Sequence, residues 1–262
     1  MIRVFTSSYP EPSETRCYEL LRCLKTNLNL TWIQAVHVFL EGNKSEHRCH
    51  PKAVWRAVKT RPTYQDFFTW ANSQITTTDN VSIIANSDIY FDETIMPLAK
   101  SLKTNQCAAL SRWDVRPDGS ATLFDRNDSQ DVWVFRGKIR PVVSDYLMGV
   151  PRCDNRLLYE LRQAGYEVIN PAFSVRAFHL HAGERTEYPG QINGPHVEGP
   201  YEYLWPHNLM NLPARMLHNI RHPDTKLGWR IDWRKLQRTL PWRVFNKIKR
   251  RRARGDGLGA AS

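Results

Sequence analysis

The segment from Val81 to Asp92, VSIIANSDIYFD, constrains the fold of this chain more than any other. Its first four residues are typical of a buried strand, which ends abruptly in small and acidic residues, the last of them Asp88. In open α/β sheets the carboxyl edge of the strands is where ligands bind. A carboxylate there can bind a divalent cation or the hydroxyls of a sugar or ribose. We therefore expect Asp88 to have a functional role, whereas Asp92 is interpreted as the N-cap of the next helix.

Strand and helix patterns alternate along the chain. Apolar residues at helical spacing predict four helices, at Ser13–Leu28, Tyr64–Ile75, Ile95–Leu102 and Asp154–Ala164. Short apolar or alternating runs predict strands at Ile2–Thr6, Ile33–Leu40, Val81–Ile84, Cys107–Leu110, Asp131–Gly137, Val168–Pro171 and Ser174–His181. This order is typical of an α/β fold with a mostly parallel sheet and flanking helices. We expect one such domain at residues 1–212 and a basic, Trp-containing helical appendage with a disordered end at residues 213–262.

Positive charge is concentrated near the C-terminus. Residues 229–254 contain 11 Lys or Arg and one acidic residue, whereas residues 1–228 contain 26 basic and 24 acidic residues. Trp229, Trp233 and Leu236 share a helical face with basic flanks. Such a face suits an anionic membrane surface, which is the interpretation that we favour. Packing of the tryptophans on the domain is the second interpretation, and nucleic-acid binding is the third.

The cysteine pattern and the absence of long apolar runs indicate a cytoplasmic protein. The five cysteines have no C-x-x-C spacing, and their odd number argues against a closed disulfide framework. His47, Cys49 and His50 lie close together but lack a second ligand pair, so a metal site there is not favoured. No apolar run has the length of a membrane span or a signal-peptide core. We expect a cytoplasmic protein that can lie peripherally on the inner face of the membrane.

Four short motifs occur in order along the chain: Asn86-Ser87-Asp88-Ile89, Ser129-Gln130-Asp131-Val132-Trp133, Gly149 with Asp154-Asn155-Arg156, and Phe178-His179-Leu180-His181. Over roughly residues 1–210, this set resembles a GT-A-fold glycosyltransferase of the small bacterial and viral type that builds surface polysaccharides. The resemblance implies a Rossmann-like fold and a nucleotide-sugar donor. It also implies transfer of a hexosyl or deoxyhexosyl group to a glycan or a lipid-linked acceptor.

The resemblance also implies a metal site. In such enzymes a D-x-D motif binds the metal that bridges the two phosphates of the donor, and Asn86-Ser87-Asp88 stands at the matching place with Asn instead of the first Asp. A divalent cation, Mn²⁺ or Mg²⁺, would be held by Asp88 and one imidazole. His181 is the first candidate imidazole and His179 is the second, although a core position is the interpretation that we favour for His179. We expect the two rings to point to opposite faces of their extended segment, so that only one reaches the donor.

Asp154 is the candidate catalytic base. Inverting transfer requires a carboxylate on the acceptor side of the anomeric carbon, where it takes the proton of the attacking hydroxyl. Asp154 stands just before a predicted helix and resembles the base position of the family. An ordinary helix N-cap is the alternative interpretation.

Other residues near predicted strand ends and helix starts are expected to contact the donor: Thr6, Ser7, Ser8, Glu41, Arg61, Asn86, Ser87, Arg112, Asp131 and Trp133. Residues 183–206 form a long Gly- and Pro-rich stretch without a clear period. Loops of this length are usually lids or binding loops. We expect Arg185 and Tyr188 within it to contact the acceptor or to belong to a lid.

Two other functions compete with glycosyl transfer. A nucleotidyltransferase normally requires a Gly-rich basic phosphate loop near the N-terminus, and Thr6-Ser7-Ser8-Tyr9-Pro10 is not such a loop. A non-catalytic nucleic-acid-binding protein would use the basic tail. The near-neutral balance of residues 1–228 argues against that function. Glycosyl transfer is therefore the function that we expect.

Overall fold

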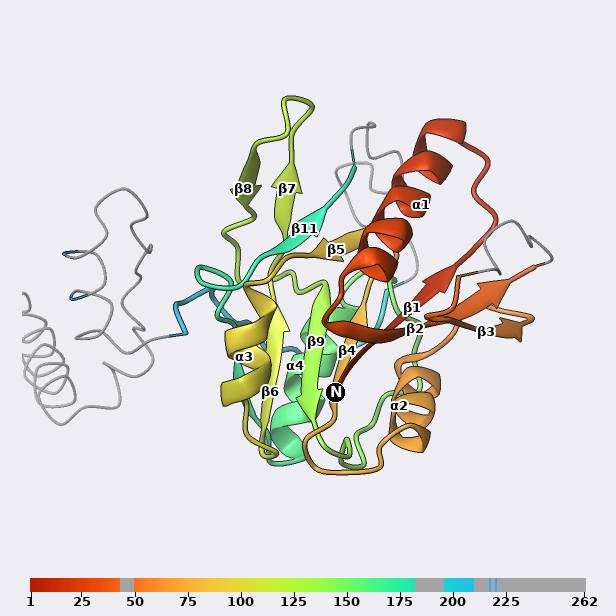
Figure 1. Ribbon diagram of the computed structural model, residues 1–262. Helices are drawn as coiled ribbons and strands as arrows, with labels where there is room; N and C mark the ends of the chain where they lie inside the picture. Colours follow the sequence, from red (N-terminus) through yellow and green to blue (C-terminus); the bar gives the residue numbers. More distant parts are fainter. Residues whose placement is uncertain (43–49, 182–195, 210–216, 218–219, 221–262) are drawn as a thin grey trace, which may run out of the picture.

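Two β-sheets and four helices make up the part of the chain that the computed structural model describes, residues 1–42, 50–181, 196–209, 217 and 220 (Figure 1). The larger sheet has the strand order β10-β6-β9-β4-β1-β2-β3. Its strands are β1 (Ile2–Ser8), β2 (Ile33–Glu41), β3 (Ala53–Val58), β4 (Val81–Ala85), β6 (Gln106–Leu110), β9 (Val132–Arg136) and β10 (Glu167–Ile169). Only β9 runs antiparallel to its neighbours in this sheet. The predicted mostly parallel α/β sheet is therefore confirmed.

Helices cover both faces of the larger sheet. They are α1 (Glu14–Asn29), α2 (Tyr64–Ser73), α3 (Ile95–Ser101) and α4 (Cys153–Gln163). Because side chains alternate along a strand, Val4 of β1 packs with α1 and α3, whereas its neighbour Phe5 packs with α2 and α4. Figure 1 shows the same layering, with α3 in front of the strands and α4 behind them. The flanking helices are therefore arranged as the sequence predicts.

Local chemistry explains where the helices begin. Ser13 accepts the backbone N–H of Arg16 at 3.3 Å and caps α1. Thr63 forms a reciprocal capping box with Asp66 at the start of α2. The expectation for Asp92 is wrong, because the N-cap residue of α3 is Thr94. Asp92 instead accepts the Thr94 backbone N–H at 3.0 Å in the preceding turn.

A second, smaller sheet adjoins the first and was not predicted as a unit. Its strands are β5 (Ile89–Phe91), β7 (Trp113–Val115), β8 (Ala121–Leu123) and β11 (Ala177–His179), in the order β5-β11-β7-β8. The strands β5, β7 and β8 were not predicted, and neither was β3 of the larger sheet. Strands of three residues are too short to show a period of two. The pairing of β5 and β7 with β11 also depends on segments far apart in the chain.

The topology collects the ends of several strands at one edge. Strands β1, β2 and β4 run parallel, so their carboxyl ends lie together. Residues 86–88 join β4 to β5 at this edge. Since β9 is antiparallel to β4 and pairs Val132 with Ala85, it begins where β4 ends. Asp131, just before β9, is therefore delivered to the same edge as Asp88.

Several expectations concern residues that the structure describes only in part. The predicted appendage at residues 213–262 lies outside the described residues except for Leu217 and Ile220, so the domain boundary remains a prediction. Within the described part of the chain, no helix has both the length and the apolar character of a membrane span.

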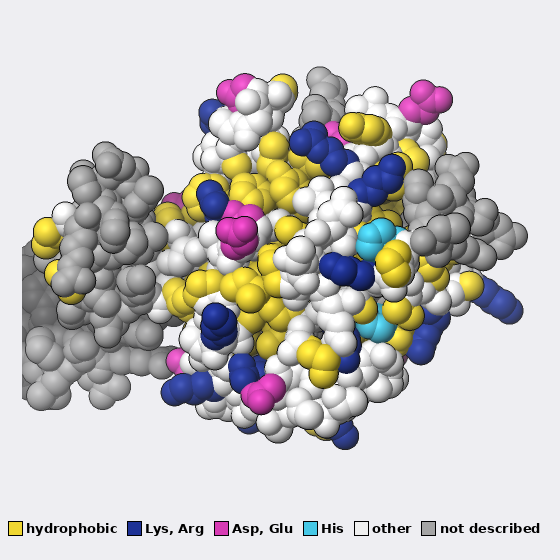
Figure 2. Space-filling model, in the orientation of Figure 1, with side chains coloured by type: hydrophobic (Ala, Val, Ile, Leu, Met, Phe, Trp, Pro, Cys, Tyr) yellow, Lys and Arg dark blue, Asp and Glu magenta, His cyan; other side chains and the backbone are white. Residues whose placement is uncertain are grey.

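Cys17, Cys23, Cys107 and Cys153 are free thiols. On the face shown in Figure 2, Lys and Arg side chains are scattered and do not form one basic patch.

Candidate active site

Two adjoining cavities lie at the carboxyl edge of the larger sheet. The apolar cavity encloses about 150 Å³, and its walls are mainly Val4, Leu20, Leu21, Leu24, Leu40, Trp55 and Ile89. The polar cavity encloses about 160 Å³, and its charged and imidazole groups belong to Arg16, Arg61, Asp88, Arg112, Asp131, His179 and His181. Both cavities are lined by Ser7, Tyr9, Asn86 and Ser87. A single ligand could therefore occupy the two cavities together.

The Asp88 carboxylate is held by two cationic partners. Its Oδ2 forms an ion pair with Arg16 and lies 3.1 Å from Nε2 of His179, while its Oδ1 is buried without a hydrogen-bond partner among the described residues. Burial by itself would raise the pKa of Asp88. The hydrogen bond from His179 and the charges of His179 and Arg16 outweigh burial and hold this pKa well below its usual range. Asp88 is therefore ionised at neutral pH, and one of its oxygens has no partner among the described residues.

Asp88, His179 and His181 form a group that could hold a metal ion, with ligand atoms within 4.8 Å of one another. Our expectation that the two rings face opposite ways is wrong, because they stack with centroids 5.7 Å apart. Residues two positions apart on an extended chain share a face. The unpartnered Asp88 Oδ1 and the imidazoles fit a transition ion such as Mn²⁺ better than Mg²⁺, which prefers oxygen ligands.

His179 is a site residue and not a core histidine. Nδ1 lies 2.8 Å from Asp114, and Nε2 lies 3.1 Å from Asp88. Burial lowers the pKa of His179, but the two carboxylates outweigh burial and raise it to about 9. The imidazole is therefore protonated at neutral pH in this arrangement. It must lose one of these hydrogen bonds and a proton before it can bind a metal.

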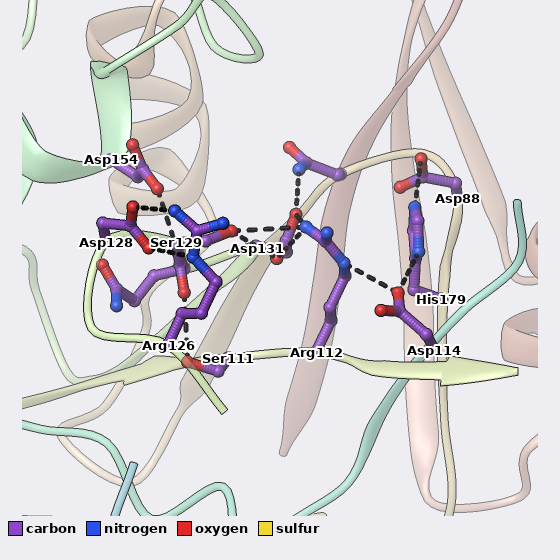
Figure 3. Close-up of polar contacts among 12 residues, drawn as sticks. Asp88, Ser111, Arg112, Asp114, Arg126, Asp128, Ser129, Asp131, Asp154 and His179 are labelled. Atoms are coloured by element: carbon purple, nitrogen blue, oxygen red, sulfur yellow. Dashed lines mark hydrogen bonds and ion pairs between the residues drawn. The ribbon is translucent and has the colours of Figure 1, made fainter. Parts of the chain in front are cut away.

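Arg112 and Asp131 occupy the centre of a row of polar contacts (Figure 3). Arg112 Nη1 pairs with Asp131 Oδ2 at 3.2 Å, and Arg112 Nε donates to Asp114 Oδ1 at 2.8 Å. Asn86 donates from Nδ2 to Asp131 Oδ1 at 3.0 Å. Asn86, which replaces the first acid of the D-x-D pattern, therefore uses its amide N–H to bind Asp131. It therefore adds no second carboxylate beside Asp88.

The apolar cavity contains two polar atoms without partners. Thr6 Oγ1 and Trp55 Nε1 are buried, and neither has a hydrogen-bond partner among the described residues. Leaving a buried polar group unpaired costs on the order of 1–3 kcal/mol, so such atoms are expected to meet a ligand or a water molecule. The residues that line this cavity therefore combine apolar walls with polar groups, of which one hydroxyl and one indole N–H are buried without a described partner.

Asp154 lies at the far end of the row from Asp88 (Figure 3). Its Oδ2 accepts the backbone N–H of Gln130 at 3.0 Å, and its Oδ1 accepts that of Asn155 at 3.0 Å. The ordinary N-cap interpretation is wrong, because the N-cap residue of α4 is Arg152, at φ +68°. Burial raises the pKa of Asp154 to about 7, despite the opposing hydrogen bond from Gln130. Asp154 does not line either cavity. Gly149, which comes shortly before α4 in the chain, does line the polar cavity.

Comparisons with known proteins give partial likenesses. No protein-family model matches the sequence, and no curated protein matches it. A Desulfovibrio desulfuricans structure, provisionally described as a nucleotide-diphospho-sugar transferase, is similar with 13% identity and a TM-score of 0.41 over 64% of this chain and 78% of that chain. A mannosyltransferase from Pyrobaculum calidifontis, in complex with GDP-Man and Mn²⁺, is similar with 13% identity and a TM-score of 0.44 over 71% and 58% of the two chains.

A nucleotidyltransferase also resembles part of the chain. The 2-C-methyl-D-erythritol 4-phosphate cytidylyltransferase of Francisella tularensis has 15% identity and a TM-score of 0.35, over 52% of this chain and 72% of that chain. Because all these likenesses are partial, the two cavities themselves carry our proposal for the function.

The structure brings most of the predicted donor contacts to the cavities: Thr6, Ser7, Ser8, Arg61, Asn86, Ser87, Asp88, Arg112, Asp131 and His181. Trp133 is not among them, because its side chain is fully buried in the core against Tyr64. The prediction that Trp133 contacts the donor is therefore wrong. Glu41 ends β2 as expected but does not line either cavity. Arg185 and Tyr188 lie outside the described residues.

Sequence reasoning missed Tyr9, Arg16, Trp55 and Asp114 as site residues, and it favoured a core position for His179. Tyr9 follows β1 directly and belongs to the Thr6–Pro10 stretch that was considered only as a phosphate loop. Its position after a strand was a signal that could have been used. Arg16 and Trp55 offered no such signal. They lie in α1 and β3, and the sequence does not show which elements pack next to these two.

Proposed function

We propose that this protein transfers a sugar from a nucleotide-sugar donor to a glycan or lipid-linked acceptor. One observation carries the proposal: an apolar cavity and a strongly charged cavity adjoin at the carboxyl edge of the sheet and share four lining residues. A nucleoside diphosphate has the matching composition, with a flat heterocycle at one end and two phosphates at the other. The carboxyl edge of a parallel sheet is also the common place for such ligands.

The apolar cavity would take the nucleoside. Its leucine side chains and Trp55 offer the apolar surface that a heterocycle requires. Thr6 Oγ1 and Trp55 Nε1 have no partners among the described residues and are available for hydrogen bonds to the base or ribose. Tyr9 lines both cavities and would lie at the passage between the nucleoside and the phosphates.

The polar cavity would take the diphosphate and the transferred sugar. Arg61 lines it and makes no ion pair with any described residue, so its guanidinium is available to a phosphate. Asp88, His181 and His179 would hold a divalent cation, for which Mn²⁺ fits the ligand set better than Mg²⁺. When bound, the cation would supply positive charge to the diphosphate leaving group. Asp131 faces the cavity beside Arg112 and could accept hydroxyls of the sugar.

Asp154 is our proposal for the general base of an inverting reaction. A base works best when its pKa is close to the operating pH, and burial raises the pKa of Asp154 to about 7. Both oxygens now accept backbone N–H groups, so the acceptor hydroxyl would have to approach the remaining lone pairs. The acceptor would enter beside Gly149, which lines the polar cavity just before α4.

A thermal-shift screen tests the proposed function. The full-length protein is melted with a panel of nucleotide sugars, with their free nucleosides and with inorganic pyrophosphate, each with Mn²⁺ and with EDTA. A donor present at 100 times its Kd stabilises the fold by about 2.7 kcal/mol, which raises the melting temperature measurably. We expect one nucleotide class to give the largest shift. If no nucleotide diphosphate or nucleotide sugar shifts the melting temperature, the proposal is contradicted.

Product analysis separates glycosyl transfer from nucleotidyl transfer. With the donor from the screen and a glycan acceptor, we expect release of a nucleoside diphosphate and elongation of the acceptor. Release of pyrophosphate from a nucleoside triphosphate and a sugar phosphate would instead indicate a nucleotidyltransferase. That result would contradict the proposed sugar transfer and leave nucleotide binding intact.

We also propose that the protein works in the cytoplasm, with residues 229–254 at an anionic membrane surface. Support comes from the sequence, which has 11 basic residues and three tryptophans in this segment. We expect the full-length protein to co-sediment with phosphatidylglycerol vesicles and not with phosphatidylcholine vesicles. Replacing the 11 basic residues by Gln should abolish co-sedimentation. Salt-dependent RNA binding without vesicle binding would contradict this proposal.

A further inference from the structure

Arg16 occupies a position in the polar cavity that the sequence did not indicate. It lies in the first turn of α1, and its Nη2 pairs with Asp88 Oδ2. Its Nη1 donates to Glu19 at 2.9 Å and to the carbonyl oxygen of Leu180 at 2.5 Å. Only 16% of the side chain is exposed. Three partners therefore fix the guanidinium against the Asp88 carboxylate.

Arg16 and a divalent cation require the same carboxylate. Asp88 is the only acid in the candidate metal group of the described residues, and one of its two oxygens already contacts the guanidinium. Asn86 adds no second negative charge, because its side chain is a neutral amide, whose Nδ2 donates to Asp131. Leu180 lies between the two candidate histidines, so Arg16 also ties their backbone to Asp88. A cation entering this group would meet a fixed positive charge at short range.

We propose that Arg16 is a resident counter-cation at Asp88 that weakens divalent-cation binding there. The proposal rests on the cation site of the proposed function. It names the residue that sets the affinity of that site for a divalent cation. Arg16 neutralises Asp88 when no metal is bound and repels the ion that would replace it.

A titration with Mn²⁺ alone tests the proposal. Free Mn²⁺ is followed by electron paramagnetic resonance in the presence of the full-length protein, so that no nucleotide is required. Arg16→Gln and Arg16→Met remove the charge, and we expect each to bind Mn²⁺ at least about tenfold more tightly than the wild type. Arg16→Lys keeps a charge and should stay within about threefold of the wild type. Arg22→Gln changes an exposed arginine of α1 that does not line either cavity and should have no effect.

The outcomes separate this proposal from the proposed function. Unchanged or weaker Mn²⁺ binding in a folded Arg16→Gln or Arg16→Met variant overturns the role of Arg16. Adding Asp88→Asn to either variant should abolish the gain, and retention of the gain would place the ion elsewhere and overturn the proposal as well. Melting curves establish that each variant is folded, and the two neutral substitutions differ in polarity, so one can serve if the other unfolds. The nucleotide-sugar screen on the wild type is independent of all these results.

Discussion

The two cavities share four residues yet differ in how their polar groups are satisfied. In the apolar cavity, Thr6 Oγ1 and Trp55 Nε1 are buried without partners among the described residues. In the polar cavity, most charged groups already pair with one another, as Arg112 does with Asp131. The groups left without a partner are therefore neutral in the apolar cavity, whereas in the polar cavity they include the Asp88 Oδ1 oxygen. Under the function that we propose, hydrogen bonds to neutral groups would select the nucleoside, and the charged groups would attract the diphosphate.

The two cavities also differ in the elements that form their walls. The apolar cavity is built from one face of α1 and the neighbouring strands, where helical and strand periodicity determine which side chains are present. The polar cavity is built mainly from turns and from the smaller sheet, with Arg16 added from α1. The smaller sheet places His179 between Asp114 and Asp88. Variants in each cavity should therefore act on different parts of one ligand.

The largest expected effect lies outside both cavities. Asp154→Asn should reduce the transfer rate by about 10²- to 10⁴-fold and leave the affinities for nucleoside and pyrophosphate unchanged. The wild-type rate should rise as the pH increases through about 7, because the base must lose its proton. Initial rates and calorimetric binding measure the two quantities. Asp128→Asn, which alters a nearby carboxylate paired with Arg126, is the matched control. A variant with wild-type turnover would remove Asp154 from catalysis.

The pH dependence of either cavity must be separated from that of the fold. His37 is buried between Phe5 and Trp70, and burial lowers its pKa to about 4, with smaller contributions from Arg3 and Arg56. The unfolded chain binds this proton near pH 6.5, so the stabilisation is complete above that pH and is lost as the pH falls toward 4. The loss should approach about 3 kcal/mol.

Urea unfolding at several pH values tests this expectation. The His37→Phe variant should lose most of the decline in unfolding free energy between pH 6.5 and 4, because it has no group to protonate there. Phe also suits the stacked position against Phe5. An identical decline in wild type and variant would show that other groups govern acid unfolding.

Arg61→Gln tests the polar cavity. It should weaken pyrophosphate binding by about tenfold, the loss of one charge-assisted contact, and leave nucleoside binding unchanged. Lys59→Gln removes a charge from an exposed neighbour that does not line either cavity. Calorimetry with the two ligands measures the effect. Equal losses of affinity for both ligands would mean that the nucleoside and the diphosphate do not occupy separate cavities as we propose.

Trp55→Phe tests the apolar cavity and should have the smallest effect. Removing the indole N–H should weaken nucleoside binding by about fivefold, the loss of one hydrogen bond, without changing pyrophosphate binding. Trp32→Phe is the matched control, since Trp32 Nε1 is also buried without a described partner but lies outside both cavities. If the two variants bind the nucleoside equally well, Trp55 does not contact it.

Much of the site was accessible from the sequence for one reason. Thr6 and Ser7 lie at the carboxyl end of β1, and Asn86 and Asp88 follow β4. The carboxyl ends of parallel strands meet at one edge whatever their order. The error at Trp133 arose because a residue next to the edge can still point into the core, as the fully buried indole does. The error for the two histidines came from the wrong face assignment along an extended chain.

The sequence by itself determined the alternation of strands and helices, the buried faces of those elements and the carboxylate at the end of β4, because periodicity and strand ends are local properties of the chain. Only the tertiary structure decided which side chains meet Asp88. Arg16 and His179 reach it across separations of 72 and 91 residues. Those contacts depend on the order of strands in two sheets and on the placement of α1. No local pattern encodes that order, because it follows from the packing of the whole domain.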